Sequence, residues 1–308
     1  MSLLRIGVLL VLALGASALA SCPSVGYIFP CRCAIGPLCH CPEAHCSGVR
    51  DTATLQDALT HFANRGVVNI KIDFSRFNMS GNFFPRGMQV HKLRIRNSWI
   101  GWCPESNPLG PLAECLNQFT IVKSNLPTNW TVFSVLKRLE IMEFRECVGD
   151  MPTSFADIPA SLRMLRLTWC NARDLAPGAF AHMSSLGRVY IQGSKLERIR
   201  RGVFSGSSLT MLSLENNCIS AVEDGSFDDV PNLISLDLSG NNIRTLPVDA
   251  FQNSPRLFVT LSKNPYSCDC SAKWLMKYVD NWKLPQCSEP PSVRGRYMSE
   301  LEDHFMSC

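Results

Sequence analysis

The side chains best suited to chemistry in this sequence are its cysteines, which number 15 among 308 residues. Cysteines at this density either form disulfides in an oxidising compartment or hold metals and redox centres in a reducing one. Their spacing shows no iron–sulfur pattern, so disulfides are favoured. We therefore expect a secreted, extracellular protein that is stabilised by disulfide bonds.

One cysteine cluster also has the residue types of a zinc site. It reads Cys39-His40-Cys41-Pro42-Glu43-Ala44-His45-Cys46. Because a secreted chain oxidises clustered thiols, we expect disulfides here and no metal. Two pairings stay open for Cys39 and Cys41, which either close a small bridge with each other or bond to other cysteines.

Motifs for catalysis are missing from the sequence. The six histidines form no His-Glu-x-x-His motif, no Gly-x-Ser-x-Gly occurs, and no glycine-rich phosphate loop follows a predicted strand. The acidic residues are scattered, so no carboxylate pair can be nominated as acid and base. We therefore predict a protein that is not an enzyme, with no catalytic residue and no cofactor.

Composition and charge narrow the class of protein further. With 46% apolar and 18% charged residues, the chain has material for a sizeable core and is not disordered. A formal net charge of +4 is small for this length and predicts no nucleic-acid binding.

The first 20 residues are typical of a secretory signal peptide. Arg5 precedes an apolar run at 6–14, and Ala18-Leu19-Ala20 ends the segment with a small-x-small cleavage pattern. The run is shorter than the roughly 20 residues of a membrane span, which disfavours an uncleaved anchor. We expect cleavage after Ala20, no membrane span and release from the cell.

The elements that must position the remaining residues follow an apolar repeat of the form L-x-x-L-x-L-x-x-N-x-L. The four clearest copies recur at intervals of 24, 23 and 24 residues and begin at Leu162, Leu186, Leu209 and Leu233. Each places a phenylalanine 18 residues after its first leucine, at Phe180, Phe204, Phe227 and Phe251. Relaxed copies bring the number of rungs to nine and begin at Val67, Val90, Leu116, Leu136 and Leu257.

Repeats of this form are identified as leucine-rich repeats. Each unit supplies a short strand and a return segment, and it buries its apolar side only by stacking on its neighbours. The predicted fold is therefore α/β, a leucine-rich repeat solenoid with a curved parallel sheet of about nine rungs. The repeat asparagine bonds the backbone of its turn. We expect looser or differently satisfied turns where another residue replaces it, at Ser75, Ser98, Ser124, Cys170 and Ser194.

A stack of repeats leaves its first and last apolar faces exposed, so caps are required. The end of the chain fits N-P-x-x-C-x-C-x-x-x-W-L from Asn264 to Leu275 and resembles the C-terminal cap of extracellular leucine-rich repeat proteins. The segment from Cys22 to Cys46 resembles the matching N-terminal cap. We therefore divide the chain into a signal peptide at 1–20, an N-terminal cap at 21–66, repeats at 67–263 and a C-terminal cap at 264–308.

This resemblance implies four cap disulfides and a short helix that carries Trp274 over the last rung. The implied pairs are Cys22 with Cys33, Cys31 with Cys46, Cys268 with Cys287, and Cys270 with Cys308. The combination of caps and rungs most resembles an arthropod group of secreted proteins that includes the non-catalytic subunit of the Oplophorus-luciferin 2-monooxygenase. That group implies a glycosylated, non-enzymatic partner of a catalytic chain.

The other cysteines lie among the rungs. Cys103 and Cys115 bracket an insertion and are expected to staple it as a loop. Cys147 and Cys170 sit at comparable heights on neighbouring rungs and are expected to pair. Cys218 is then the odd thiol, with two options, a free thiol or an intermolecular disulfide.

Residues between the apolar strand positions face the concave side of such a solenoid. This face is basic along the first six rungs, and we predict that it binds another secreted protein, with an acidic protein face or a sulfated glycan as its target. The alternative is a solvated strand face whose cations only keep the sheet soluble. The residues predicted to bind are Lys92, Arg94, Arg96, Arg138, Arg166, Arg188 and Tyr190.

Two sequons predict glycans at Asn78 and Asn129, each just beyond a strand and facing solvent. Two functions remain open for the protein. The first is an accessory subunit of an extracellular complex such as a luciferase-type monooxygenase. The second is an extracellular matrix or signalling binder of a receptor or sulfated glycan.

Overall fold

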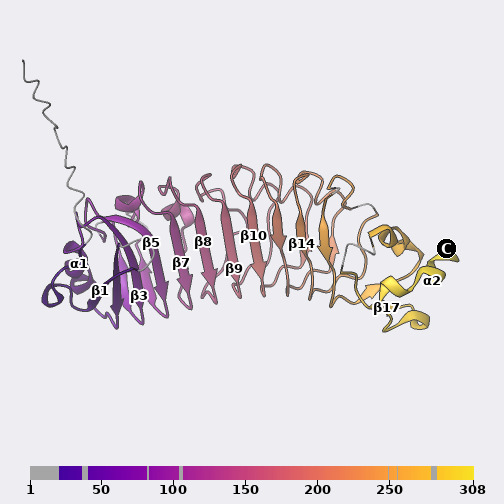
Figure 1. Ribbon diagram of the computed structural model, residues 1–308, viewed down its shortest axis with the longest axis horizontal. Helices are drawn as coiled ribbons and strands as arrows, with labels where there is room; N and C mark the ends of the chain where they lie inside the picture. Colours follow the sequence, from indigo (N-terminus) through magenta and orange to yellow (C-terminus); the bar gives the residue numbers. More distant parts are fainter. Residues whose placement is uncertain are drawn as a thin grey trace, which may run out of the picture.

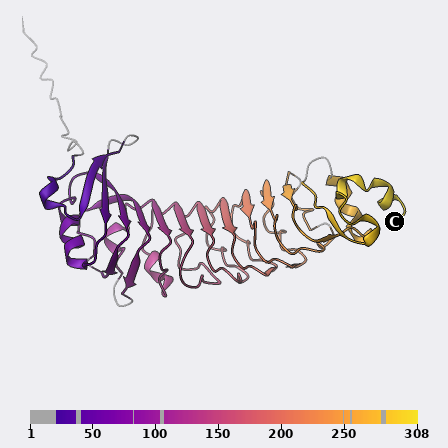
Figure 2. The same cartoon turned by 90° about the horizontal axis from the view of Figure 1, so that it is seen from below.

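The computed structural model describes residues 21–36, 41–81, 83–103, 107–248, 250–254, 256–278 and 283–308. The predicted signal peptide lies outside these residues. The described chain forms one elongated, gently curved body, with strands stacked along its length and a cap at each end (Figures 1 and 2). This is the solenoid that the repeat spacing predicts.

One 11-stranded sheet runs through the body (Figure 1). Its first two strands, β1 (Cys31–Ile35) and β2 (Pro42–Ser47), pair antiparallel in the N-terminal cap. From β2 onward the neighbours are parallel, and every predicted rung contributes one strand. These strands are β3 (Val67–Asp73), β5 (Gln89–Arg96), β7 (Gln118–Val122), β8 (Ile141–Arg145), β9 (Met164–Thr168), β10 (Arg188–Gln192), β12 (Met211–Ser213), β14 (Ser235–Asp237) and β15 (Phe258–Thr260).

The return segments are mostly irregular, as expected for short rungs. Two of their strand pairs are parallel, β4 (Arg76–Met79) with β6 (Trp99–Trp102) and β11 (Arg198–Ile199) with β13 (Ala221–Val222). Short 3₁₀ turns complete the N-terminal part at η1 (Val25–Tyr27), η2 (Gly110–Leu112) and η3 (Trp130–Phe133).

Each cap covers one end of the stack with helical turns. Helix α1 (Thr52–Thr60) follows β2 and buries Leu55, Ala58 and Leu59. The C-terminal cap consists of β16 (Tyr266–Ser267), η4 (Cys270–Tyr278), β17 (Cys287–Glu289), η5 (Pro291–Val293), η6 (Met298–Glu300) and α2 (Glu302–Met306). Leu275 on η4 is fully buried, so this cap closes the apolar face of the last rung.

A column of aromatic rings runs through the C-terminal half of the core. The ring centroids of Phe155 and Phe180 are 5.2 Å apart, and those of Phe180 and Phe204 are 5.9 Å apart. The column continues through Phe227 and Phe251 to Trp274 of the cap. Such contacts contribute about 0.5–1.5 kcal/mol per pair beyond area burial, so the periodic phenylalanines couple each rung to the next.

The turn after each C-terminal strand is closed by a buried asparagine. Asn217 Nδ2 donates to the carbonyls of Ile191 and Leu214 at 2.7 and 2.9 Å, and its Oδ1 accepts from Leu196 N–H at 3.3 Å. Asn241 and Asn264 repeat these contacts. The backbone groups of each turn are thus paired, as buried polar groups require.

Serines close the N-terminal turns by a different set of bonds. The hydroxyls of Ser75, Ser98 and Ser124 accept from the backbone N–H of the preceding rung at 3.1, 3.1 and 2.9 Å. Each hydroxyl donates in turn to the carbonyl at the end of its own strand. The turns are therefore differently satisfied rather than loose.

The residue between each strand and this closing residue has a left-handed backbone. Glycine holds the position after the cap strand β2 and in two rungs, at Gly48, Gly193 and Gly240, with φ of 68°, 62° and 66°. Larger side chains hold it elsewhere, with φ between 49° and 57°, at Phe74, Asn97, Lys123, Glu146, Trp169, Asn216 and Lys263. Bulky side chains rarely adopt this conformation, so Phe74 and Trp169 are the unusual members.

The four cap disulfides have the pairings that the family resemblance implies, Cys22–Cys33, Cys31–Cys46, Cys268–Cys287 and Cys270–Cys308. Cys41 is also disulfide-bonded, and Cys39 lies outside the described residues. Because Cys41 and Cys46 are both oxidised, they provide no thiolate for zinc. A further disulfide joins Cys147 and Cys170, which hold the closing position in consecutive turns.

The expected disulfide between Cys103 and Cys115 is wrong for this structure, which leaves both as thiols. Cys115 is buried, and its Sγ accepts from Val90 N–H at 3.4 Å and donates to a backbone carbonyl of its own turn. Its sulfur is thus held within the core beside β5 and not toward the loop. Cys218 is a free, exposed thiol.

Candidate partner-binding face

The sheet lies on the inner side of the curve (Figure 2), so its outward side chains line that side. The strand register places them in three rows that cross the rungs. The middle row, for example, runs His45, Lys71, Arg94, Thr120, Glu143, Arg166, Tyr190, Ser213, Asp237 and Thr260. We call this side of the sheet the concave face.

One rung differs in register from its sequence prediction. The repeat pattern placed Arg138 outward in a rung that begins at Leu136, but Met142 is fully buried and pairs in register with the buried Phe119. Arg138 is exposed in the turn before β8 and is not on the concave strands. The outward residues of β8 are Ile141, Glu143 and Arg145.

Several cations of the concave face are bound to carboxylates. Asp73, whose side chain is 6% exposed, receives two hydrogen bonds from Arg96 at 3.1 and 2.7 Å and contacts His45 at 2.9 Å. Lys71 bonds Glu43 of the cap strand at 2.9 Å, and this hydrogen bond lowers the pKa of Glu43. These pairs tie the N-terminal cap to the first two rungs.

A second cluster centres on Glu143 in the middle of the sheet. Its carboxylate lies 3.5 Å from Arg145 and 3.8 Å from Arg166. The Arg166 guanidinium also stacks 4.6 Å from the centre of the Tyr190 ring, which is a favourable cation–π distance. The side chains of Arg166 and Tyr190 therefore contact each other within the protein, which leaves less of each available to a partner.

Lys92, Arg94 and Arg188 differ from these residues. All three are exposed on concave strands, and none has an ion pair with another described residue. Because none of them is held in such an ion pair, they are the cations best able to attract an acidic partner, although the charge of Lys92 also helps to lower the pKa of Glu43. We call them the open cations.

A trough of about 270 Å³ lies beside two of the open cations. Its floor is made by short or buried side chains of the sheet, including Asn69, Thr120 and Val122. Lys92 and Arg94 of β5 line one side, and Glu143 and Arg145 of β8 line the other. The trough exists because β7 presents the short side chains of Thr120 and Val122 between the longer, charged side chains of β5 and β8.

Charge changes sign along the described concave strands. Strands β3 to β10 carry the cations, whereas Glu215 and Asp237 are the charged residues that follow β10 in the outward rows. The face is thus basic toward the N-terminal cap and weakly acidic toward the other end, as the sequence indicates.

Both predicted sequons lie on the surface away from this face. Asn78 is exposed on β4, and Asn129 is exposed at the start of η3, where its Oδ1 accepts from Thr131 N–H at 3.0 Å. Glycans at these positions would leave the concave face open.

The sequence alone did not reveal which carboxylates pair with the cations of the concave face. Glu43 belongs to a cap strand whose register no repeat pattern gives, and the predicted register of the fourth rung placed Arg138 on the concave face and left Glu143 out of it. Asp73 was visible on the first rung, but its pairing with Arg96 depends on the register between β3 and β5.

Comparison with known proteins supports the repeat architecture. Residues 160–219 and 207–265 match the family model described as leucine rich repeat. The chain is 31% identical over 144 residues to leucine-rich repeat and fibronectin type-III domain-containing protein 4 of Rattus norvegicus, covering 44% of this chain and 23% of that protein. It is 28% identical over 187 residues to leucine-rich repeat transmembrane protein FLRT2 of Mus musculus, covering 49% and 28%.

A solved structure gives the same fold. One chain of the octameric complex of Latrophilin 3, Unc5D and FLRT2 matches with a TM-score of 0.62 at 19% identity, covering 93% of this chain and all of that chain. The chain spans about a quarter of the length of the curated relatives it matches. Among the described residues, no helix has the length and apolar character to cross a membrane.

Proposed function

Taking this chain as a leucine-rich repeat protein with disulfide-closed caps, we propose that it is an extracellular protein-binding scaffold whose concave face takes an acidic surface of another protein. The observation that carries the proposal is the set of open cations, Lys92, Arg94 and Arg188, on one rigid sheet, with a trough beside the first two. A fixed array of unneutralised charge selects a complementary surface and steers its approach.

The paired cations have a different role in this proposal. Three of them form ion pairs with carboxylates of the same face, namely Arg96, Arg166 and Lys71. Each pair offsets the positive charge that a partner would otherwise meet. They shape the surface around the trough and keep its side chains in place. A partner then gains most of its electrostatic attraction from the three open cations.

Relatives of part of this chain support a protein as the ligand. FLRT2 occurs in an octameric complex with Latrophilin 3 and Unc5D, so that assembly joins modules of different proteins. For this chain, a folded receptor or secreted protein is accordingly the first candidate. The accessory-subunit version, with a luciferase-type monooxygenase as partner, rests on the cap motifs alone. A sulfated glycan is the remaining alternative.

Affinity capture from the native secretion tests the proposal. The wild-type protein, the variant Lys92→Glu/Arg94→Glu/Arg188→Glu and a control, Arg198→Glu/Arg244→Glu, are immobilised at equal density. The control reverses two exposed arginines outside the concave face. One stoichiometric protein retained by the wild type and the control, and lost from the triple variant, supports the proposal.

The identity of the captured partner separates the alternatives. A catalytic chain favours the accessory subunit, and a receptor favours the signalling binder. Equal capture by the triple variant, or retention of sulfated glycan in place of protein, contradicts the proposal.

A further inference from the structure

A second groove lies on the edge of the solenoid where β3, β5 and β7 end in their turns. It encloses about 790 Å³ and is lined by Val49, Arg50, Phe74, Ser75, Arg76, Asn97, Ser98, Trp99, Lys123, Ser124, Asn125 and Val148. These residues come from five consecutive turns, the first of them in the N-terminal cap. None belongs to the outward rows of the concave face. We call it the turn groove.

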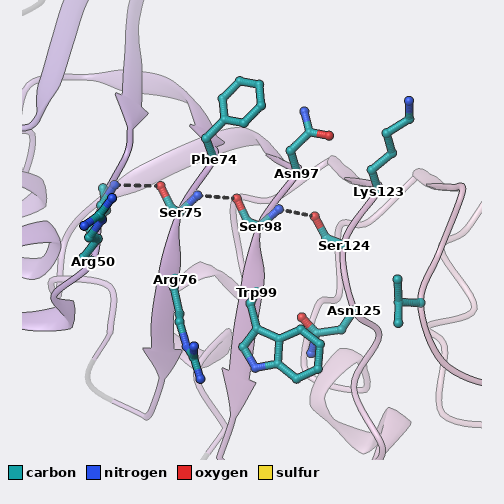
Figure 3. Close-up of a pocket in the computed structure, with 12 residues that line it drawn as sticks. Arg50, Phe74, Ser75, Arg76, Asn97, Ser98, Trp99, Lys123, Ser124 and Asn125 are labelled. Atoms are coloured by element: carbon teal, nitrogen blue, oxygen red, sulfur yellow. Dashed lines mark hydrogen bonds between the residues drawn. The ribbon is translucent and has the colours of Figure 1, made fainter.

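The turn groove has a floor and two walls (Figure 3). The floor is the serine ladder of Ser75, Ser98 and Ser124. The left-handed residues Phe74, Asn97 and Lys123 project on one side of the ladder, and Arg76, Trp99 and Asn125 project on the other. Because the same turn recurs in consecutive rungs, the side chains at equivalent positions form two columns, and these columns are the walls of the groove.

The polar groups of the floor are already satisfied. The serine hydroxyls bond the neighbouring backbone, and the Asn125 amide makes hydrogen bonds of 2.7 and 2.8 Å with the backbone of Ile100. A ligand in the groove therefore gains little from the floor. Recognition must come from the exposed side chains of the walls.

Those walls present large apolar side chains to solvent. Phe74 is 62% exposed, Trp99 is 54% exposed and Val148 is 56% exposed. Phe74 also has a φ of 50°, at a position that Gly48 and Gly193 hold in other turns. A bulky, exposed aromatic in this conformation contributes nothing to the core, which points to a role in binding.

The charges of the groove have one sign. Arg50 and Arg76 are exposed, and neither forms an ion pair with another described residue. Lys123 is paired with Glu146 at 3.2 Å, and Glu146 does not line the groove. The lining residues include no carboxylate, so the groove complements a ligand that carries negative charge.

We infer that the turn groove binds an extended, acidic polypeptide segment with apolar side chains, presented by a partner protein. Five turns spaced about 4.8 Å apart span about 19 Å, which matches six extended residues. Acidic residues of the segment meet Arg50 and Arg76, and apolar ones cover Phe74 and Trp99. A sulfated glycan would satisfy the arginines but would offer no apolar side chain to these rings.

Selection from a displayed library of random eight-residue peptides tests the inference. We expect the recovered peptides to combine Asp or Glu with aromatic or aliphatic residues. The synthesised peptides should bind the variant Arg50→Glu/Arg76→Glu at least about tenfold more weakly, and replacing their acids with amides should cause a similar loss. Trp99→Ser should weaken binding of the peptides, but this variant should still bind the acidic peptides more tightly than their amide versions.

Two controls separate this site from the concave face. The variants Lys92→Glu/Arg94→Glu/Arg188→Glu and Arg198→Glu/Arg244→Glu should bind the peptides as the wild type does. Urea unfolding checks that Trp99→Ser folds, and the arginine reversals change only exposed side chains. The inference is overturned if no peptide is recovered, if recovered peptides lack acids, if the Arg50/Arg76 reversal leaves affinity unchanged, or if a heparin fragment binds the groove in their place.

Discussion

Arg96 and Asp73 face each other across β5 and β3, joined by two hydrogen bonds of 3.1 and 2.7 Å. Asp73 is buried, and His45 of the cap strand approaches it from the opposite side at 2.9 Å. This contact makes Arg96 a structural residue, although the sequence analysis grouped it with the cations predicted to bind a partner on the concave face. Its neighbour Arg94 points to the same face and has no such partner.

Reversal of Arg96 should therefore cost stability. Arg96→Glu removes both arginine hydrogen bonds from the buried Asp73 carboxylate, which costs about 1–3 kcal/mol, and adds repulsion between the two carboxylates; the His45 contact remains. The matched variant Arg94→Glu, on an exposed side chain, should change the free energy of unfolding by less than about 0.5 kcal/mol. Urea unfolding of both variants checks this, and equal stabilities would contradict the structural role of Arg96.

The serine ladder gives a second prediction. Ser98→Ala removes the hydroxyl that accepts from Ser75 N–H at 3.1 Å and donates to the Arg96 carbonyl at 2.8 Å. The buried backbone groups left unpaired should cost about 1–3 kcal/mol of unfolding free energy. Arg76→Ala, at an exposed strand position beside the same ladder, is the control and should be nearly neutral. A neutral Ser98→Ala would show that the ladder is dispensable.

Tyr266 predicts a specific loss of stability at high pH. Its side chain is buried, which raises the pKa of its hydroxyl well above the ordinary value, and it accepts from Leu246 N–H at 3.1 Å. Folding therefore favours the neutral phenol. Its contribution is complete below the unfolded-state pKa of about 10 and declines as the pH rises above it.

Tyr266→Phe tests this sign. The variant should be less stable at pH 8, because Leu246 N–H loses its acceptor, but its stability should fall less between pH 9 and 11 than that of the wild type. Thermal unfolding across this range is the measurement. Parallel declines in the two proteins would contradict the assignment to Tyr266.

The thiols give a fourth prediction. Alkylation of the denatured, unreduced protein should label Cys103, Cys115 and Cys218. In the native protein Cys218 should react first, whereas Cys115 should resist, because burial raises its thiol pKa. Peptide mapping that found a Cys103–Cys115 disulfide would restore the sequence prediction and contradict the structure.

The sequence predicted the fold well because each repeat can bury its apolar side only by stacking on its neighbours, so the repeat period fixes the stacking. Leu212, Leu236 and their counterparts fix one buried strand position every 23 or 24 residues, and the Cys-rich motifs mark the ends. The rung that went wrong is rich in apolar residues at several registers. Leu136, Leu139 and Ile141 fit the L-x-x-L-x-L spacing, and so do Leu139, Met142 and Phe144, which is the set that the structure buries.

The site was less predictable, because its properties depend on contacts between rungs. Lys92 and Arg96 read alike in sequence, and only the register of β3 against β5 shows that Arg96 has a buried partner. The turn groove was missed for the same reason. Phe74 and Trp99 lie on different rungs, and they become opposite walls only when the turns stack.

The most direct test of the central claim is the salt dependence of partner association. The captured partner is bound to the wild type, to Lys92→Glu/Arg94→Glu/Arg188→Glu and to the Arg198→Glu/Arg244→Glu control, and association rates are measured from low to high salt. The wild-type and control rates should fall as salt screens the open cations, and the triple variant should associate about tenfold more slowly at low salt with little salt dependence. A triple variant with the wild-type rate and the wild-type salt dependence would contradict the concave face as the binding surface.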